Sequence, residues 1–530
     1  MDKFGGLTKT SSRIAIAAAL GMTLGGFVMS SHPAKAADLG GDCCADLEER
    51  VAELEATTVR KGNKKVSVTI SGWVVKLGTW WNDGHTGGLY WGDKDTTLSS
   101  HIQISGSATI APGWSAGYTL WLETPGNSAS AGFVENQFDD NNQLVGPGGI
   151  NTLDSFMWIK SDTWGTTNWG RLVQATNNLA LLPDLSGTII ESNGVLFDGA
   201  GFFIRPNHVK NSNDLATDFN WLSVVSCLSG GGGVGADCPT GLDGNGVRYD
   251  SPTWYGFSVS GGYYENYEWD VAAKWAGDWD NLKWSLAYGF TENTDEGCNA
   301  AGIATNSAEA GGGGCPFQGF RKDVESNQFG ASVLHVPTGL WAYGMFQNEH
   351  NDGTPFLTLN ENLDIVKSAA NDTDVWFAKA GIKRTWVPLG ATVIWGEGGQ
   401  YFDEFGNGQC FGNQHVLGVP GNQGFCGNLL IPSGQLTTGP FDGQNILNQV
   451  AVNGSTVNRW GAGIVQEIDS AAMHVFFRWQ HLELQDFRMV CTDEVDGCIS
   501  AHGQTVDAGD RVKESFKPLD LFQVGGVIFF

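Results

Sequence analysis

The sequence has few charged residues, and most of them carry the same sign. Only 16% of the 530 residues are charged, with 30 Lys and Arg against 57 Asp and Glu, so the formal net charge is −27. A chain this acidic lacks the basic surface that binds phosphate backbones. We therefore expect no nucleic-acid partner.

Long apolar runs are missing after the first residues. From Ala37 onward no run reaches the roughly eighteen apolar residues of a transmembrane helix. The opening stretch, MDKFGGLTKTSSRIAIAAALGMTLGGFVMSSHPAKA, combines a basic start, one apolar segment and small residues before Ala37. This pattern predicts a secretory signal peptide over residues 1–36 rather than a membrane anchor.

Catalytic signatures are also missing. The chain has no G-x-S-x-G and no H-E-x-x-H motif, and its ten His are scattered. Its GGGG runs do not join a strand to a helix, as a phosphate-binding loop would. We expect no enzymatic activity, no metal site and no cofactor.

Glycine and tryptophan are abundant instead, with 75 and 21 residues. Glycine weakens helices, so this composition favours short strands joined by turns. Its lack of a three-residue period excludes collagen. Sixteen strand-like runs follow: 65–81, 96–111, 114–124, 152–161, 166–175, 243–251, 254–264, 267–276, 281–292, 326–336, 339–350, 372–386, 389–402, 455–468, 471–484 and 515–530.

The runs alternate with a period of two, which is typical of strands. In 471–484, Val475 and Phe477 share one face, whereas Arg478 and Gln480 share the other. In 65–81 the apolar parity switches near Gly72, which predicts a bulge or bend there.

The connections alternate between tight turns and long polar segments. The tight turns contain APGW, DTWG, SPTWYG, GDWDN, VPTG, WVPLG and EIDSA, which carry the residues that turns require. An even number of strands places every tight turn on one side and every long segment on the other. Outer-membrane barrels have this asymmetry, with the short turns and both termini at the periplasmic side. A secreted carbohydrate-binding β-sandwich is the alternative, and it explains the asymmetry less well.

The chain ends in QVGGVIFF without a polar tail. Its spacing of polar, glycine, apolar and aromatic residues looks like the signal read by the barrel-assembly machinery of the outer membrane. The residues that carry it are Gln523, Gly525, Ile528 and Phe530. A last strand that closes a barrel cannot fray, and a hydrophobic edge strand in a soluble fold would invite aggregation.

Eight of the ten cysteines form pairs that each bracket one loop-like segment. An exported protein meets an oxidising compartment. We therefore expect four local disulfides, Cys227–Cys238, Cys298–Cys315, Cys410–Cys426 and Cys491–Cys498. Cys43 and Cys44 bridge neighbouring subunits or stay reduced.

The segment 37–64 contains the one helical pattern. Apolar or small residues recur at heptad a and d spacing, which favours a short coiled coil over a helix lying against the barrel. Those residues are Cys44, Leu47, Val51, Leu54 and Thr58. The expected organisation is a signal peptide (1–36), a periplasmic coiled-coil segment (37–64) and a transmembrane β-barrel (65–530).

Several stretches resemble rhizobial-type alphaproteobacterial porins. They are ADLGGDCCADLEERVAELEATTVRKGNKKVSVTISG, WGRLVQATNNLALLPDLSGTIIESNG, GVRYDSPTWYGFSVS and the terminal Phe. The resemblance covers the whole mature chain. It implies an all-β, sixteen-stranded antiparallel transmembrane barrel that forms homotrimers, with a third loop folded into the pore. The paired cysteines depart from that pattern and put the loop shapes in doubt.

The segment after the fifth run is the candidate constriction of that pore. LALLPDLSGTIIESNGVLFDGAGFFIRP is too apolar for a solvated loop, so we expect it to pack against an inner wall. Its acids, Asp184, Glu191 and Asp198, would then project into the pore. The candidate basic wall consists of Lys76, Arg171, Arg205, Arg248, Arg459 and Arg478, with the facing of each uncertain by one residue of register.

We therefore expect an outer-membrane porin through which small hydrophilic solutes and ions diffuse passively. Its partners would be two further copies of the chain, outer-membrane lipid and lipopolysaccharide, and the barrel-assembly machinery. An outer-membrane barrel hydrolase is the second alternative, which would need a Ser/His pair on its outer wall.

Overall fold

The computed structural model of the protein describes most of the predicted barrel region. The described residues are 66–94, 100–124, 150–193, 244–265, 268–293, 324–351, 372–402, 450–491 and 515–530, the short stretches 357–359, 365–367, 498–499, 505–507 and 510–512, and residues 202, 204, 205, 207, 221 and 224. Among these residues no helix is long and apolar enough to cross a bilayer.

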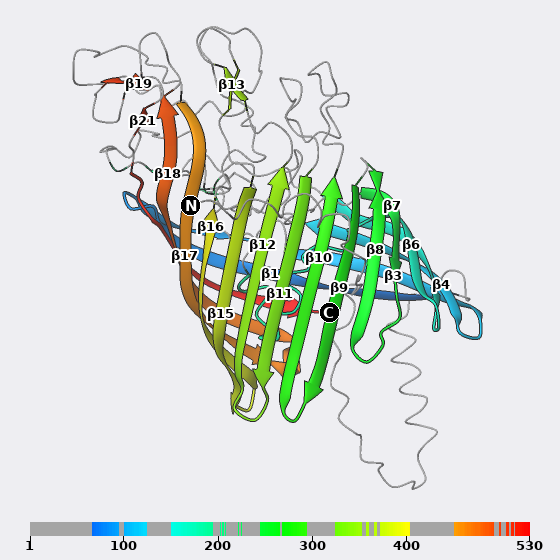
Figure 1. Ribbon diagram of the computed structural model, residues 1–530. Helices are drawn as coiled ribbons and strands as arrows, with labels where there is room; N and C mark the ends of the chain where they lie inside the picture. Colours follow the sequence, from blue (N-terminus) through cyan, green and yellow to red (C-terminus); the bar gives the residue numbers. More distant parts are fainter. Residues whose placement is uncertain are drawn as a thin grey trace.

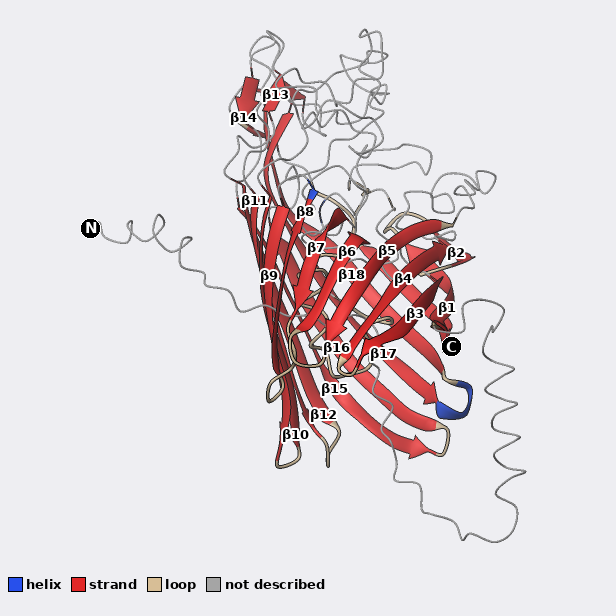
Figure 2. Ribbon diagram, turned by 90° about the vertical axis from the view of Figure 1, so that its right-hand side faces the viewer, coloured by secondary structure: helices blue, strands red, loops and turns tan. Residues whose placement is uncertain are grey.

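The described residues form a closed antiparallel β-barrel of sixteen strands (Figures 1 and 2). The ring contains β1 (Ser67–Asn82), β3 (Ser100–Ala111), β4 (Trp114–Thr124), β5 (Asn151–Ser161), β6 (Gly165–Leu172), β7 (Gly244–Asp250), β8 (Phe257–Tyr264), β9 (Glu268–Trp279), β10 (Leu282–Asn293), β11 (Val324–His335), β12 (Leu340–Asn351), β15 (Asp372–Val387), β16 (Gly390–Phe402), β17 (Val450–Ile468), β18 (Met473–Cys491) and β22 (Leu519–Phe529). The predicted strands are thereby confirmed.

Six short strands lie outside this ring. β2 (Gly87–Gly92) pairs with the C-terminal half of β1, and β21 (Arg511–Val512) pairs with β18. The other four form two small ladders, β13 (Leu357–Leu359) with β14 (Ile365–Lys367), and β19 (Cys498–Ile499) with β20 (Thr505–Val506). Figure 1 shows β13, β19 and β21 at the end of the barrel opposite the tight turns.

The tight turns use residues that tolerate left-handed backbone. Asp280 and Asn281 connect β9 to β10 with φ of 46° and 75°, the paired positive angles of a type I′ hairpin. Gly256 has φ +82°, and a Cβ there would lie 1.9 Å from the carbonyl oxygen of Ala276. A single 3-10 turn, η4 (Asp469–Ala471), connects β17 to β18.

The first and last strands close the barrel. β1 pairs with β22 from Trp73↔Phe529 to Asn82↔Asp520. Beyond that ladder Gly72 and Phe530 exchange two backbone hydrogen bonds of 2.9 and 3.0 Å. The backbone of Phe530 is therefore held in the sheet by Gly72.

Each strand has an outer face and an inner face. The outer face carries exposed apolar side chains such as Val475 and Phe477, at 41% and 47% exposure, whereas Phe476 and Arg478 on the inner face are almost completely buried. The alternation predicted for 471–484 is confirmed. Exposed tryptophans gather at the tight turns, as interfacial aromatics do in outer-membrane barrels: Trp114, Trp164, Trp254, Trp279 and Trp386.

β1 shows why its apolar parity switches. The ladder passes Gly72 without a register shift, although that residue has φ +156°. The irregularity predicted near Gly72 is therefore an unusual backbone conformation of that one residue, and no extra residue is inserted into the strand. The switch arises because Leu77 and Trp81 point to the inner face, where they join a buried cluster with Phe202 and Trp221.

Candidate functional site

The stretch that follows β6 packs against the inner face of the barrel. We call residues Val173–Asn193 the near limb. It has no regular helix, but successive turns order it, for example through hydrogen bonds from Leu181 N to Asn178 O (2.9 Å) and from Ser192 N to Thr188 O (2.7 Å). Leu179, Leu181 and Ile190 are buried, whereas Leu182, Leu185 and Ile189 are half-buried.

The first half of the near limb is attached to β9, β10 and β11. Thr176 donates from its backbone N and its Oγ1 to Asp270 Oδ2, at 2.7 and 3.0 Å. Gln328 Nε2 donates to the carbonyl of Thr176 at 2.9 Å. Gly330 has no side chain because the backbone of Ala180 lies there, with its carbonyl oxygen 2.1 Å from the place of a Cβ.

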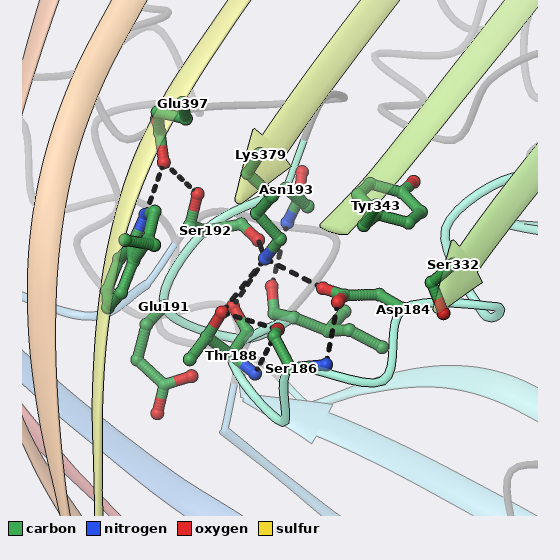
Figure 3. A network of polar contacts seen from close by, with 12 residues as sticks. Asp184, Ser186, Thr188, Glu191, Ser192, Asn193, Ser332, Tyr343, Lys379 and Glu397 are labelled. Carbon is green, nitrogen blue, oxygen red and sulfur yellow. Dashed lines mark hydrogen bonds and ion pairs between the residues drawn. The ribbon is translucent and has the colours of Figure 1, made fainter. Parts of the chain in front are cut away.

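A buried lysine anchors the second half (Figure 3). Lys379 on β15 forms an ion pair of 2.7 Å with Asp184, and the two side chains are 0% and 2% exposed. Its ammonium also donates to Thr188 Oγ1 (2.9 Å) and to the carbonyl of Ser192 (2.7 Å). Ser186 N donates to the other Asp184 oxygen at 2.9 Å. One lysine thus fixes three points of the near limb.

The end of the near limb is held by β16, β17 and β18. Ser192 Oγ donates to Glu397, and Arg459 Nη2 donates to the carbonyl of Asn193 at 2.6 Å. Arg478 donates to the backbone carbonyl of Glu191. The Glu191 carboxylate lies 2.8 Å from His474 Nδ1.

A second attachment involves the few described residues farther along the same connection. Phe202 packs on Trp81 of β1 with ring centroids 5.0 Å apart. Arg205 forms a buried ion pair with Asp83, in the turn between β1 and β2. The carbonyl of Arg205 accepts a hydrogen bond from Lys517 N at 2.7 Å. The β1–β2 hairpin and Lys517, just before β22, therefore hold this part of the connection.

The predicted acids and bases fall into distinct groups. Asp184 and Glu191 contact the wall and are buried, and Asp198 lies outside the described residues. Three of the predicted bases have buried side chains on the inner face and contact the near limb: Arg248, Arg459 and Arg478.

Two predicted bases lie on the other side of the wall. Lys76 shares the outer face of β1 with exposed Val74 and Trp80, and it pairs with Asp93. Arg171 is exposed on the outer face of β6, where its Nε donates to the carbonyl of Leu153 at 3.1 Å. The physical reason is register, because a shift of one residue exchanges the two faces.

Sequence reasoning missed the lysines that face inward. Lys379 anchors the near limb, and Lys383 forms a 2.6 Å ion pair with Glu467. Lys274 is buried on the inner face of β9. The same alternation with a period of two holds in 267–276 and 372–386, where the three lysines lie opposite the face of Val271 and Trp376, so that signal was available.

Residues of the predicted C-terminal assembly signal contact neighbouring strands of the barrel. Gln523 accepts from Arg478 Nε at 3.0 Å and donates to Thr79 Oγ1 at 3.1 Å. At Gly525 a Cβ would lie 2.7 Å from the Phe476 ring. Ile528 is exposed on the outer face.

Several predictions fall beyond the described part of the chain. Residues 1–64, and with them the signal peptide and the coiled coil, lie outside the described residues. So do six paired cysteines, Cys227, Cys238, Cys298, Cys315, Cys410 and Cys426. Cys491 ends β18 and Cys498 begins β19. Within the described residues no group of three or more His, Cys, Asp or Glu could hold a metal ion.

A closed antiparallel barrel with an apolar outer face and a partly charged inner face is the architecture of an outer-membrane channel. Residues 28–407 match the family model of the Gram-negative porins. The chain belongs to this family and is an outer-membrane porin channel.

The chain is similar to solved structures of other outer-membrane channels. One is an anion-selective porin from Comamonas acidovorans, 13% identical, with 88% of this chain and 100% of that chain covered and a TM-score of 0.43. Another is the outer membrane channel DcaP of Acinetobacter baumannii, 9% identical, with 89% and 99% covered and a TM-score of 0.40. No curated protein sequence matches the chain.

Proposed function

We propose that the inner face lines a water-filled pore for passive diffusion of small hydrophilic solutes and ions, and that the near limb is a third loop folded inward to narrow it. The observation that supports this most strongly is the buried Lys379 anchor, which holds three points of the near limb against the wall. A connection that only covered the barrel mouth would not need such attachments.

Single-channel recording in planar bilayers tests this function. The full-length purified protein should give discrete conductance steps in KCl, and sugar-loaded liposomes that contain it should release small sugars faster than large ones. Membranes that stay insulating would contradict the proposal. Lipid hydrolysis without conductance would favour the barrel hydrolase instead.

We also propose that the tight turns and both termini face the periplasm, with the long connections meeting lipopolysaccharide outside. The one-sided turns and their exposed tryptophans support this orientation. The terminal residues Gln523, Gly525, Ile528 and Phe530 would present the sorting signal to the assembly machinery. Protease added to intact cells should then cut the protein only in its long connections.

The proposed subfamily and oligomeric state follow from the sequence patterns. We propose a rhizobial-type porin, a signal peptide over 1–36, and a homotrimer supported by a coiled coil within 37–64. A seam this short is marginal alone, so the barrel walls would provide most of the trimer contact. Deleting Asp42–Thr58 should leave trimers on unheated gels with a lower dissociation temperature. Complete loss of the trimer would contradict this order of contributions.

The four local disulfides remain part of the proposal. Each would close a short loop in an oxidising compartment, and a bridge across about 15 residues adds roughly 3 kcal/mol. Peptide mapping without reduction should recover Cys227–Cys238, Cys298–Cys315, Cys410–Cys426 and Cys491–Cys498. Bridges between different loops as the main product would refute the pairing.

A further inference from the structure

Among the described residues, the buried Lys274 has no ion-pair partner. It lies in the middle of β9 on the inner face and is 7% exposed. Within the described part of the chain, its ammonium has neither a hydrogen-bond acceptor nor an ion-pair partner. Burying an ammonium in this way is costly unless a partner of opposite charge compensates it.

The nearby carboxylates are committed to other donors. Asp250 accepts from Asn168 Nδ2 (2.7 Å) and Ser260 Oγ (2.7 Å), and it pairs with Arg248 at 3.2 Å. Asp270, two inward positions before Lys274 on β9, accepts from Thr176 and Tyr264. Neither of them comes within ion-pair distance of Lys274.

The neighbours of Lys274 are small. In the ladders on either side, its partners are Ser258 on β8 and Ala287 on β10. Ala272, the inward residue before it on β9, packs against Ala175 and Leu179 of the near limb. Directly opposed residues in a sheet lie about 4.5–5.5 Å apart at their Cβ atoms, so the Ser258 hydroxyl is close to the lysine side chain.

We propose that Lys274 and Ser258 form an oxyanion-binding subsite on the pore wall beside the near limb. Its ligand is a carboxylate or phosphate group on a permeating solute, which the ammonium pairs with and the serine hydroxyl hydrogen-bonds. Arg248 adds positive potential without being a ligand, because Asp250 and the carbonyl of Val173 (2.8 Å) already occupy its guanidinium. The inference rests on the proposed pore.

Block of KCl current by inorganic phosphate tests the subsite. The full-length protein is recorded at constant ionic strength while phosphate replaces chloride, and the half-blocking concentration is measured. Lys274→Met should raise that concentration at least fivefold, Ser258→Ala about two- to threefold, and Lys274→Arg less than twofold. Lys283→Met, at an exposed lysine at the start of β10, is the control and should leave it unchanged.

Stability separates ligand binding from a structural role. Removing an uncompensated buried charge should leave the thermal unfolding temperature of Lys274→Met unchanged or raise it. A folded Lys274→Met channel with wild-type phosphate block would overturn the subsite. If that variant does not fold, equal block by Ser258→Ala, Lys274→Arg and wild type overturns it. Wild-type channels that conduct KCl without phosphate block refute only the subsite, whereas the lack of conductance refutes the pore itself.

Discussion

Asp184 and Lys379 bury opposite charges at 2.7 Å with almost no exposed side-chain surface. The desolvation of such a pair offsets much of its attraction, but removing one partner leaves the other buried and uncompensated. The pair therefore sets where the near limb lies, and its loss should be far more costly than that of an accessible pair.

Asp184→Asn and Lys379→Met should each lower the free energy of unfolding by about 3–5 kcal/mol. The double variant should lose less than the sum of the two, because neither charge is then left unpaired. Urea unfolding in lipid vesicles measures this. Lys383→Gln, which breaks a pair with side chains 28% and 17% exposed, is the control and should cost about 1 kcal/mol or less. Single variants that match the control would show that the anchor carries little energy.

At the scale of elements, the near limb depends on glycines in the wall as well as on charges. Gly330 on β11 leaves room for the backbone of Ala180, which cannot move as a side chain could. Gly344 on β12 faces open space, since the nearest atom to its Cβ position is Phe377 O at 3.9 Å. Gly344 lies on the outer face of its strand, so it serves as a control for the substitution itself on an adjacent strand.

Gly330→Val should push the near limb off the wall toward the pore axis. We expect a lower single-channel conductance and a loss of about 1–3 kcal/mol of stability from overpacking. Gly344→Val should change neither, because valine suits strands and has space there. Planar-bilayer recordings and urea titrations of both variants provide the comparison. Unchanged conductance in Gly330→Val would mean that the near limb does not border the ion path.

The strands were predictable from sequence, but the partners of the site were only partly so. Period-two alternation and turn residues depend on neighbours within a few positions, so β9, β15 and β18 were found with their faces. The face on which Lys76 lies was predicted wrongly. The inner face of β1 is apolar because Phe202 and Trp221 cover it, so the polar residues of this strand do not mark the inner face. The pairing of Asp184 with Lys379 joins residues 195 positions apart, beyond any local pattern.

On the scale of the whole molecule, closure of the barrel depends on the contact between Phe530 and Gly72. Phe530 exchanges two backbone hydrogen bonds with Gly72, where a Cβ would lie 2.2 Å from the carbonyl oxygen of His101. Deleting Phe530, or making Gly72→Ala, should reduce the fraction of heat-modifiable, folded barrel on unheated gels. Phe522→Ala, which removes an exposed aromatic from the outer face of the same strand, should fold normally. Normal folding of both variants would show that the β1–β22 pairing does not need the contact between Gly72 and Phe530.

Net charge acts on ions at a longer range than any single pair. Removing residues 1–36 changes the counts from 30 to 26 basic and from 57 to 56 acidic side chains, so the mature chain would carry −30. Its field should enrich cations at the pore mouth. The Debye length is about 30 Å at 0.01 M salt and about 3 Å at 1 M. We therefore expect a weak cation preference that declines as the KCl concentration rises, measured as reversal potentials under a fixed KCl gradient.

Neutralising acids in two places separates the long-range field from the near limb. Asp493, Glu494 and Asp496 follow β18 in sequence, and their replacement by Asn and Gln should shift the reversal potential toward anions only at low salt. Replacing Asp184, Glu191 and Asp198 together should shift it further in the same direction, because Lys379 and His474 then lose the carboxylates that they contact. This shift should persist at 1 M KCl, since charges in a narrow, partly desolvated gap are poorly screened. A larger effect from the outer set, or the same salt dependence for both sets, would mean that ions do not pass close to the near limb.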